Sequence, residues 1–269
     1  MAQPRAEVGS LAAAFLPNRA VSAPIAIGLT GFWIGVALLL WIASPWETLP
    51  GPLEVWQALG SLWWQHGMGP ELFTTLRLIL HALALTVVIS MLLSYATVIA
   101  AFRPLVEAVS KLRFLGITGL VVPFTLITGG GYPLKVWLLT FGMVTFFVTA
   151  MAQVVVEIPR AEFDHMRVLG ASELRILWEV VVRGTLDKAL DILRQILAMG
   201  WAMITMVEGI SRAEGGLGAM ILNQNKHFRL AEVYAILMAI LVLGLALDYA
   251  MGLVIRILCP HAQLERVRR

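Results

Sequence analysis

The sequence has few charges, one cysteine and no nucleotide-binding loop. Charged residues make up 14 % of its 269 positions, against roughly 25 % in soluble domains. The single cysteine, Cys259, excludes an internal disulfide framework and a cysteine-rich zinc site. The pattern Gly-x-x-x-x-Gly-Lys-[Ser/Thr] is absent, which excludes ATP binding by a phosphate loop, and no His-Glu-x-x-His pair indicates a zinc enzyme.

Apolar residues are abundant instead. They make up 59 % of the chain, and the mean hydropathy is +0.83. One soluble core cannot bury so much apolar surface, so the composition predicts an all-α protein that crosses a bilayer about six times. We expect spans near residues 25–43, 75–102, 113–128, 134–157, 186–208 and 231–257. The six-helix domain 25–258 then lies between tails 1–24 and 259–269 and contains a loop at 158–185.

Two of these spans are atypical. The third contains Pro123 and ends in the glycine run 129–131. The fifth has only 13 uncharged residues, Gln195–Val207, or about 20 Å of helix against a hydrocarbon layer of roughly 30 Å. Extending it back to Leu186 adds four charged residues, so we expect this helix inside the bundle, where protein shields its charges.

Basic residues predict the orientation. Fifteen of the 20 lysines and arginines fall on the side of the two termini and the 158–185 loop. The positive-inside rule therefore places both termini and this loop on the cytoplasmic side of the membrane. We expect this membrane to be a bacterial plasma (inner) membrane. The proline- and tryptophan-rich segment after the first span then lies outside. Its part 52–66 repeats apolar residues at helical spacing, as a helix lying in the membrane interface does.

The loop 158–185 carries the most informative pattern. Phe163, Met166 and Leu169 share one helical face, Gly170 permits a sharp turn, and Ser172 is suited to cap a second helix. Apolar residues then recur in that second helix at Leu174, Leu177, Trp178 and Val181. Two short helices of this kind would fit a groove on another protein. The alternative is that the loop packs under its own bundle.

Leu169-Gly170-Ala171-Ser172 followed by an amphipathic helix resembles the coupling loop of the permease subunits of binding-protein-dependent ABC importers. Residues 49–56 and 74–77, Glu208, the run 216–218, Gly244 and Asp248 resemble the nitrate/sulfonate/taurine branch of that family, over residues 47–260. The chain departs from the family pattern in three places. Asp164-His165-Met166 replaces a Glu-Ala-Ala triplet, Arg183 and Asp187 replace two prolines, and the glycine run 129–131 replaces a longer segment.

The resemblance implies a type I ABC importer permease with no ATPase site of its own, no metal and no bound cofactor. Its implied partners are two ATP-binding subunits that carry ATP and Mg, a second identical or different permease subunit, an extracellular or periplasmic solute-binding protein and the lipid bilayer, with no nucleic acid. Coupling to the ATPase would use Phe163, Met166, Leu169, Gly170, Ala171, Ser172, Leu174 and Leu177. The implied solute is small, such as nitrate, bicarbonate, a sulfonate or taurine.

The predicted translocation pathway uses polar and aromatic residues of the third and fifth spans: Thr125, Thr128, Trp201, Thr205 and Glu208. For each, the alternative is helix packing or capping; Glu208 could cap the outer end of its helix or pair with Arg212. Asp248 is expected to bond a neighbouring helix or sit at the inner interface, and His81 to be a hydrogen-bonded bundle residue.

Three other functions remain open from the sequence. The altered coupling motif allows an inactive half of a heterodimer. An ion-gradient-driven secondary transporter would need inverted repeats, which we do not find, and intramembrane charges near the midplane. A membrane-embedded enzyme would need a catalytic motif, and His81, Glu208 and Asp248 do not form one.

Overall fold

The computed structural model describes residues 22–45 and 48–259, which contain helices and no strand. The prediction of an all-α membrane fold is confirmed. Five of the described helices are long and apolar enough to cross a membrane: α1 (Ala23–Ile42), α3 (Met68–Ala96), α6 (Gly131–Val156), α9 (Leu186–Ile210) and α11 (Leu230–Leu258). Shorter helices connect them: α2 (Pro52–Gln65), η2 (Ala100–Phe102), α4 (Arg103–Lys111), η3 (Leu112–Phe114), η4 (Ile117–Leu120), α5 (Val121–Thr128), α7 (Arg160–Val168), α8 (Glu173–Ile176), η5 (Leu177–Arg183), η6 (Arg212–Glu214) and α10 (Leu217–Lys226).

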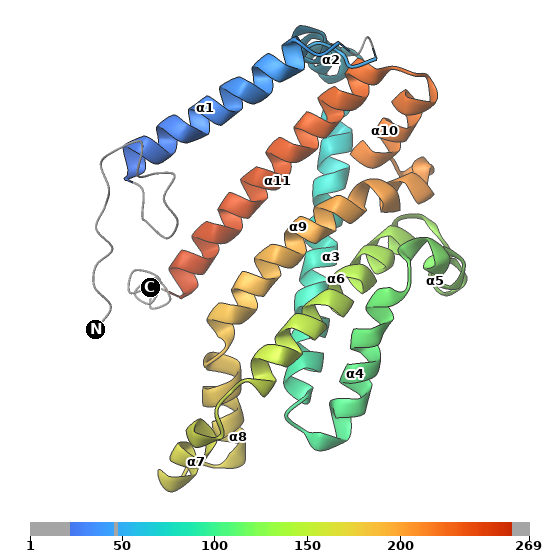
Figure 1. Cartoon of the computed structure of the whole chain (residues 1–269). Coiled ribbons are helices and arrows are strands. Elements are labelled where there is room, and N and C mark those ends of the chain that lie inside the picture. Colours follow the sequence, from blue (N-terminus) through green and yellow to red (C-terminus); the bar gives the residue numbers. More distant parts are fainter. Residues whose placement is uncertain (1–21, 46–47, 260–269) are drawn as a thin grey trace.

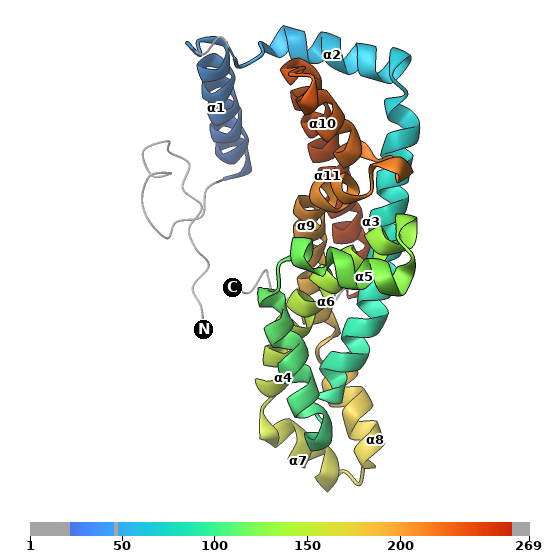
Figure 2. The same cartoon turned by 90° about the vertical axis from the view of Figure 1, so that its right-hand side faces the viewer.

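The molecule is elongated, with α2 at one end and α7 and α8 at the other (Figure 1). We call these the α2 end and the loop end. Helix α2 covers the top of the bundle, and α1 stands apart from the other helices in both views (Figure 2). No residue of α1 is buried. Its described hydrogen bond to the rest of the chain runs from Trp41 Nε1 to the carbonyl oxygen of Pro50, at 3.0 Å.

The segment predicted as the third span, 113–128, does not form one spanning helix. An extended backbone at Gly116 separates η3 from η4, and the apolar helical part, 117–128, is too short to cross a membrane. The chain instead returns from α3 to α6 through α4, three 3₁₀ turns and α5 (Figure 1). Pro123 lacks an amide hydrogen and therefore sits in the first turn of α5, where that hydrogen has no partner within the helix.

Helix α6 is the centre of the bundle and packs against α3, α4, α5 and α9. It approaches α9 closely at two glycines. A Cβ added at Gly142 would lie 2.9 Å from the sulfur of Met203, and one at Gly200 would lie 2.8 Å from the sulfur of Met143. Each helix therefore accommodates a methionine of the other above a glycine, which lets the two backbones come together.

Helix α9 lies inside the bundle despite its charged first turns. Ala189, Leu190 and Leu193 are buried, and Arg194 forms a two-point ion pair with Asp248 of α11. This pair explains how an arginine is tolerated in a spanning helix, because its charge meets a carboxylate instead of lipid. Asp248 thus bonds a neighbouring helix, which is one of the two positions that the sequence analysis gave for it; the other was the inner membrane interface.

Candidate functional site

The loop end consists of α7, a turn at Gly170, α8 and the π-helix η5. Gly170 has φ of +75°, a left-handed conformation that side chains disfavour, so glycine suits this turn. Arg167 of α7 forms an ion pair with Asp164 of the same helix (3.0 Å) and another with Glu173 of α8 (2.9 Å), and the second one links the two helices. The guanidinium of Arg167 lowers the pKa of Glu173 through this hydrogen bond.

The residues predicted to couple to an ATPase divide into two groups. Phe163 and Leu177 pack against the apolar core of the bundle. Leu169 and Leu174 are exposed, Leu174 by 80 %. Val168, which the helical spacing did not single out, is 87 % exposed beside them, and Trp178 is exposed as well. We call Val168, Leu169, Leu174 and Trp178 the apolar tip.

The remaining predicted loop residues have backbone or supporting positions. Met166 is partly buried, and its carbonyl oxygen accepts a hydrogen bond from the amide of Ala171 at 3.1 Å, which closes the turn. Ser172 occupies the N-cap position of α8 without a side-chain capping bond. The assignment of these residues to coupling stays a prediction.

Near the α2 end, a buried polar cluster fixes the start of α10. We call Glu71, Thr75, Lys135 and Glu208 the Glu208 cluster. The Glu208 side chain, with no exposed surface, accepts hydrogen bonds from the Thr75 hydroxyl and from the amide of Gly218, both at 2.7 Å. The amide of Leu217 donates to the Thr75 oxygen at 2.8 Å, and that of Gly216 donates to the Glu71 carboxylate. Side chains from α3 and α9 thus satisfy three consecutive amides at the N-terminus of α10.

Lys135 completes this cluster from α6. It is 1 % exposed, and its ammonium group donates to the carbonyl oxygen of Gly215 at 2.8 Å. It also lies near enough to Glu208, Glu214 and Glu71 for electrostatic attraction. Glu208 therefore caps α10 and not its own helix, and no ion pair between Glu208 and Arg212 forms in the described part of the chain. The sequence showed Lys135 only as one of the few basic residues on the outer side.

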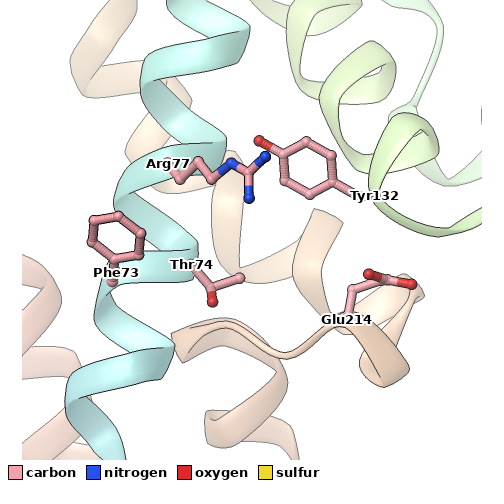
Figure 3. A pocket seen from close by; sticks show the side chains of 5 residues that line it. All are labelled: Phe73, Thr74, Arg77, Tyr132 and Glu214. Carbon is pink, nitrogen blue, oxygen red and sulfur yellow. The ribbon is translucent and has the colours of Figure 1, made fainter.

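A pocket of about 350 Å³ lies at the same end of α3 and α6 as this cluster; Figure 3 shows the residues that line it. It is lined by Phe73, Thr74 and Arg77 of α3, Tyr132 of α6 and Glu214 of η6. Arg77 points toward Tyr132, with its guanidinium carbon 5.2 Å from the ring centre (Figure 3). The Tyr132 hydroxyl lies 3.4 Å from Nδ1 of His81, which gives His81 the hydrogen-bonding role expected for it.

The five predicted pathway residues do not come together at this pocket, and none lines it. The hydroxyls of Thr125 and Thr128 donate to carbonyl oxygens of their own helix, at 2.7 and 2.8 Å. Trp201 is buried against Gly244, Thr205 is partly buried where α10 meets α9, and Glu208 belongs to the cluster described above. Within residues 22–45 and 48–259, no group of three or more His, Cys, Asp or Glu side chains could hold a metal ion.

Comparison with known proteins identifies the fold. The permease chain of a solved structure of the MetNI methionine ABC transporter, in an inward-facing conformation, superposes with a TM-score of 0.60 at 20 % sequence identity, over 70 % of this chain and 94 % of that one. The chain has the fold of an ABC importer permease. No family model matches the sequence of this permease-like chain.

Sequence relatives agree with the permease fold. Proteins named probable ABC transporter permease, from Brucella melitensis and two strains of Brucella abortus, are each 25 % identical over 231 residues. The alignments cover 83 % of this chain and 90–92 % of the relatives. The chain is thus a multi-pass membrane protein that is similar to ABC permeases over most of its length, while its branch within that family stays a prediction.

Proposed function

We propose that this chain is the channel-forming subunit of an ATP-driven importer. It would pair with a second permease subunit and with two separate ATP-binding subunits, and would receive a small solute from an extracellular binding protein. In this proposal the loop end lies in the cytoplasm and the α2 end outside, as the distribution of basic residues predicts.

The observation that carries the proposal is the apolar tip. Its four large apolar side chains are exposed, and the helices α7 and α8 of the loop end lie at the extreme end of the molecule (Figure 1). An ion pair between Arg167 and Glu173 links α7 to α8 within this projection. An exposed apolar projection of this kind fits a groove on another protein.

The loop joins the two helices that a partner would need to move. It follows α6 directly and leads into α9, and these helices pack on each other through Gly142 and Gly200. Their other ends carry Lys135 and Glu208 of the buried cluster. ATP binding to a partner subunit would therefore favour one of two arrangements of the bundle through the contact between that subunit and the loop end. Such a shift requires that the contact be stronger in one arrangement than in the other.

The direct test is co-purification from a mild detergent extract of the native host. Wild-type chain should retain an ATPase subunit, identified by mass spectrometry through its phosphate-loop sequence. Leu174→Asp should release it, because a carboxylate would have to be desolvated in an apolar groove. Val156→Asp is the matched control, since Val156 is 75 % exposed at the end of α6 but is not part of the apolar tip.

Equal recovery of the ATPase with wild type and Leu174→Asp would refute the coupling role of the tip. Transport of solute by the purified chain alone, driven by an ion gradient, would refute the importer proposal as a whole.

A further inference from the structure

Charged side chains are exposed on α4 and on the 3₁₀ turn η3 that follows it. Arg103, Glu107 and Lys111 recur every four residues and therefore share one face of α4. Arg113 follows in η3, and all four residues are exposed. Val106, by contrast, is 1 % exposed and packs toward α6. Helix α4 lies at the outside of the bundle in both views (Figures 1 and 2), so its charged face is not covered by the rest of the chain.

Helix α6 measures the depth of these charges in the membrane. Its residues 136–156 carry no charge between Lys135 and Glu157 and form about 31 Å of helix, which matches a hydrocarbon layer of roughly 30 Å. Glu157 therefore marks the surface of this layer at the loop end. Along the helix axis, Thr149 lies about 12 Å and Gly142 about 22 Å from Glu157. A typical tilt of about 20° shortens these depths by only about 6 %.

Contacts with α6 place the charges at the level of these two residues. The hydroxyl oxygens of Ser110 and Thr149 lie 2.7 Å apart, within hydrogen-bond distance. Further along the chain, Cδ1 of Ile117 lies 3.2 Å from the position of a Cβ added at Gly142. Lys111 and the arginine of η3 lie between these two contacts in the chain, and η3 itself packs against α6. Their backbone is therefore about 12–22 Å inside the layer, near its midplane.

This depth differs from what the sequence alone indicates. The uncharged run 114–134 follows these residues directly, and in a single straight span its first residue would lie at the membrane surface. The helical part 117–128 is too short to cross, so the preceding turns make part of the crossing and carry Lys111 and Arg113 into the layer. Long basic side chains reach the interface from positions near it, but a depth of about 12 Å or more exceeds their length.

Exposed charges at this depth are not placed to face lipid. Glu107, Lys111 and Arg113 form no ion pair with any residue that the structure describes. Arg194 of the α9 span differs, because Asp248 neutralises it within the chain. Ionisable side chains inside a membrane face protein or a water-filled cavity, because lipid does not solvate them. The charged face of α4 and η3 therefore borders either water or another protein.

The backbone beside the charges is irregular as well. Gly116 is exposed and extended between η3 and η4, with ψ of 134°. At membrane depth, such backbone is tolerated only where it is buried in protein or lines a water-filled cavity, because lipid offers its polar groups no hydrogen bond. A covering protein would have to supply partners for charges of both signs and for this backbone, whereas water satisfies all of them.

We propose that the face of α4 and η3 that carries Glu107, Lys111 and Arg113 borders a water-filled passage inside the membrane. The assignment rests on the importer function proposed above and gives its passage one wall. It adds the charged turns before α5 to the predicted pathway, whose residues on α5, Thr125 and Thr128, have hydroxyls that donate to their own helix.

The test is the rate at which single cysteines react with a charged, membrane-impermeant methanethiosulfonate. Cys259, the one cysteine of the chain, is first replaced by serine, and each variant is made in that background. Each chain is purified with any ATPase subunit that accompanies it, placed in lipid nanodiscs and followed by intact mass spectrometry, without nucleotide and with ATP. Lys226→Cys, at the exposed end of α10, sets the rate for full contact with water. We expect Lys111→Cys and Arg113→Cys to react within about 10-fold of this rate in at least one condition.

Two controls lie within the membrane but on other surfaces. Leu92→Cys replaces a leucine of α3 that is 70 % exposed within the apolar run 78–102, where lipid should cover it. Val106→Cys lies on α4 itself, on its buried face. Both should react at least about 100-fold more slowly than Lys226→Cys, because an ionic reagent does not enter hydrocarbon or a packed core, and a thiol in apolar surroundings is little ionised.

Slow reaction of Lys111→Cys and Arg113→Cys in both conditions, at the rate of Leu92→Cys, would overturn the assignment, since lipid or another protein would then cover this face. Fast reaction of Leu92→Cys, equal to that of Lys111→Cys, would overturn it as well, because access would not distinguish the charged face from an apolar one.

The two proposals fail separately. If the ATPase co-purifies and neither cysteine of the charged face reacts, only the passage assignment is wrong. If these cysteines react and no ATPase is recovered, the passage stands and the importer function is wrong.

Discussion

Replacing Gly218 by alanine tests the packing of α10 on α9. The new Cβ would lie 2.6 Å from Cα and 2.7 Å from the carbonyl oxygen of Thr205. These are backbone atoms of α9, and Glu208 ties α9 to Thr75 of α3 and to the amide of Gly218, so no flexible side chain can move to relieve the clash. Overpacking of this kind costs about 1–3 kcal/mol.

An opposing effect is smaller. Gly218 lies in the first turn of α10, where alanine favours the helix by at most about 1 kcal/mol over glycine. The clash therefore prevails, and we expect a net loss of about 1–2 kcal/mol in stability. For a chain of this size that loss lowers the melting temperature by roughly 2–8 °C.

The assay is thermal unfolding in detergent, followed by circular dichroism. Gly244→Ala is the matched control, because its added Cβ would lie 3.7 Å from the Trp201 ring, an ordinary contact distance. We expect this variant to unfold at the wild-type temperature or slightly above it. If Gly218→Ala is as stable as Gly244→Ala, α10 does not pack on the α9 backbone as described, and the geometry of the Glu208 cluster would be wrong as well.

Three further predictions concern charged residues. Lys135→Met should destabilise the protein by about 1–3 kcal/mol, because the carbonyl oxygen of Gly215 loses its donor and the buried carboxylate of Glu208 loses a nearby cation; chemical denaturation in detergent measures this. A double-mutant cycle of Arg194→Met and Asp248→Asn should give a coupling energy of about 0.5–3 kcal/mol. Because Arg167 lowers the pKa of Glu173 in the folded loop, this pair stabilises the loop above the unfolded pKa and stops doing so as the pH falls through the lowered folded value. Hydrogen exchange of α7 and α8 should therefore accelerate in acid.

Each of these has a control that separates it from a general effect. Lys188→Met, at an exposed position, should change stability by less than about 0.5 kcal/mol. Additive effects of the Arg194 and Asp248 changes would show that their ion pair does not form in the membrane. Glu173→Gln should remove the acid-induced acceleration, and persistence of that acceleration would assign it to another group.

The sequence predicts the spanning helices where apolar runs are long and uninterrupted. The runs that became α3, α6 and α11 contain enough apolar residues to indicate their structure without tertiary information. The segment 113–128 is also apolar, and its composition predicted a span. Its division at Gly116 depends on packing of Ile117 and Leu120 against α6 and α9, which no local pattern shows.

The candidate sites were harder to predict for a related reason. Gly170 and Ser172 mark the turn of the loop because their effects on the backbone are local. The pocket and the Glu208 cluster join residues more than 50 positions apart in the sequence, and a lone Arg77 or Lys135 has no pattern that reveals its partner. Helical spacing also missed Val168, because this residue lies off the face that Phe163, Met166 and Leu169 share, and only the structure shows that it is exposed.

The close contact of α6 with α9 determines how far a movement at one end would reach. With a methionine of each helix seated over a glycine of the other, sliding or separation would open two voids at once, so the pair should turn as one rigid body. Each helix is nearly 40 Å long. A rotation of about 5° at the loop end would shift the opposite end by roughly 3 Å. Tyr132 and Glu214 lie at that end and Arg77 lies on a different helix, so such a tilt would change the width of the pocket between them.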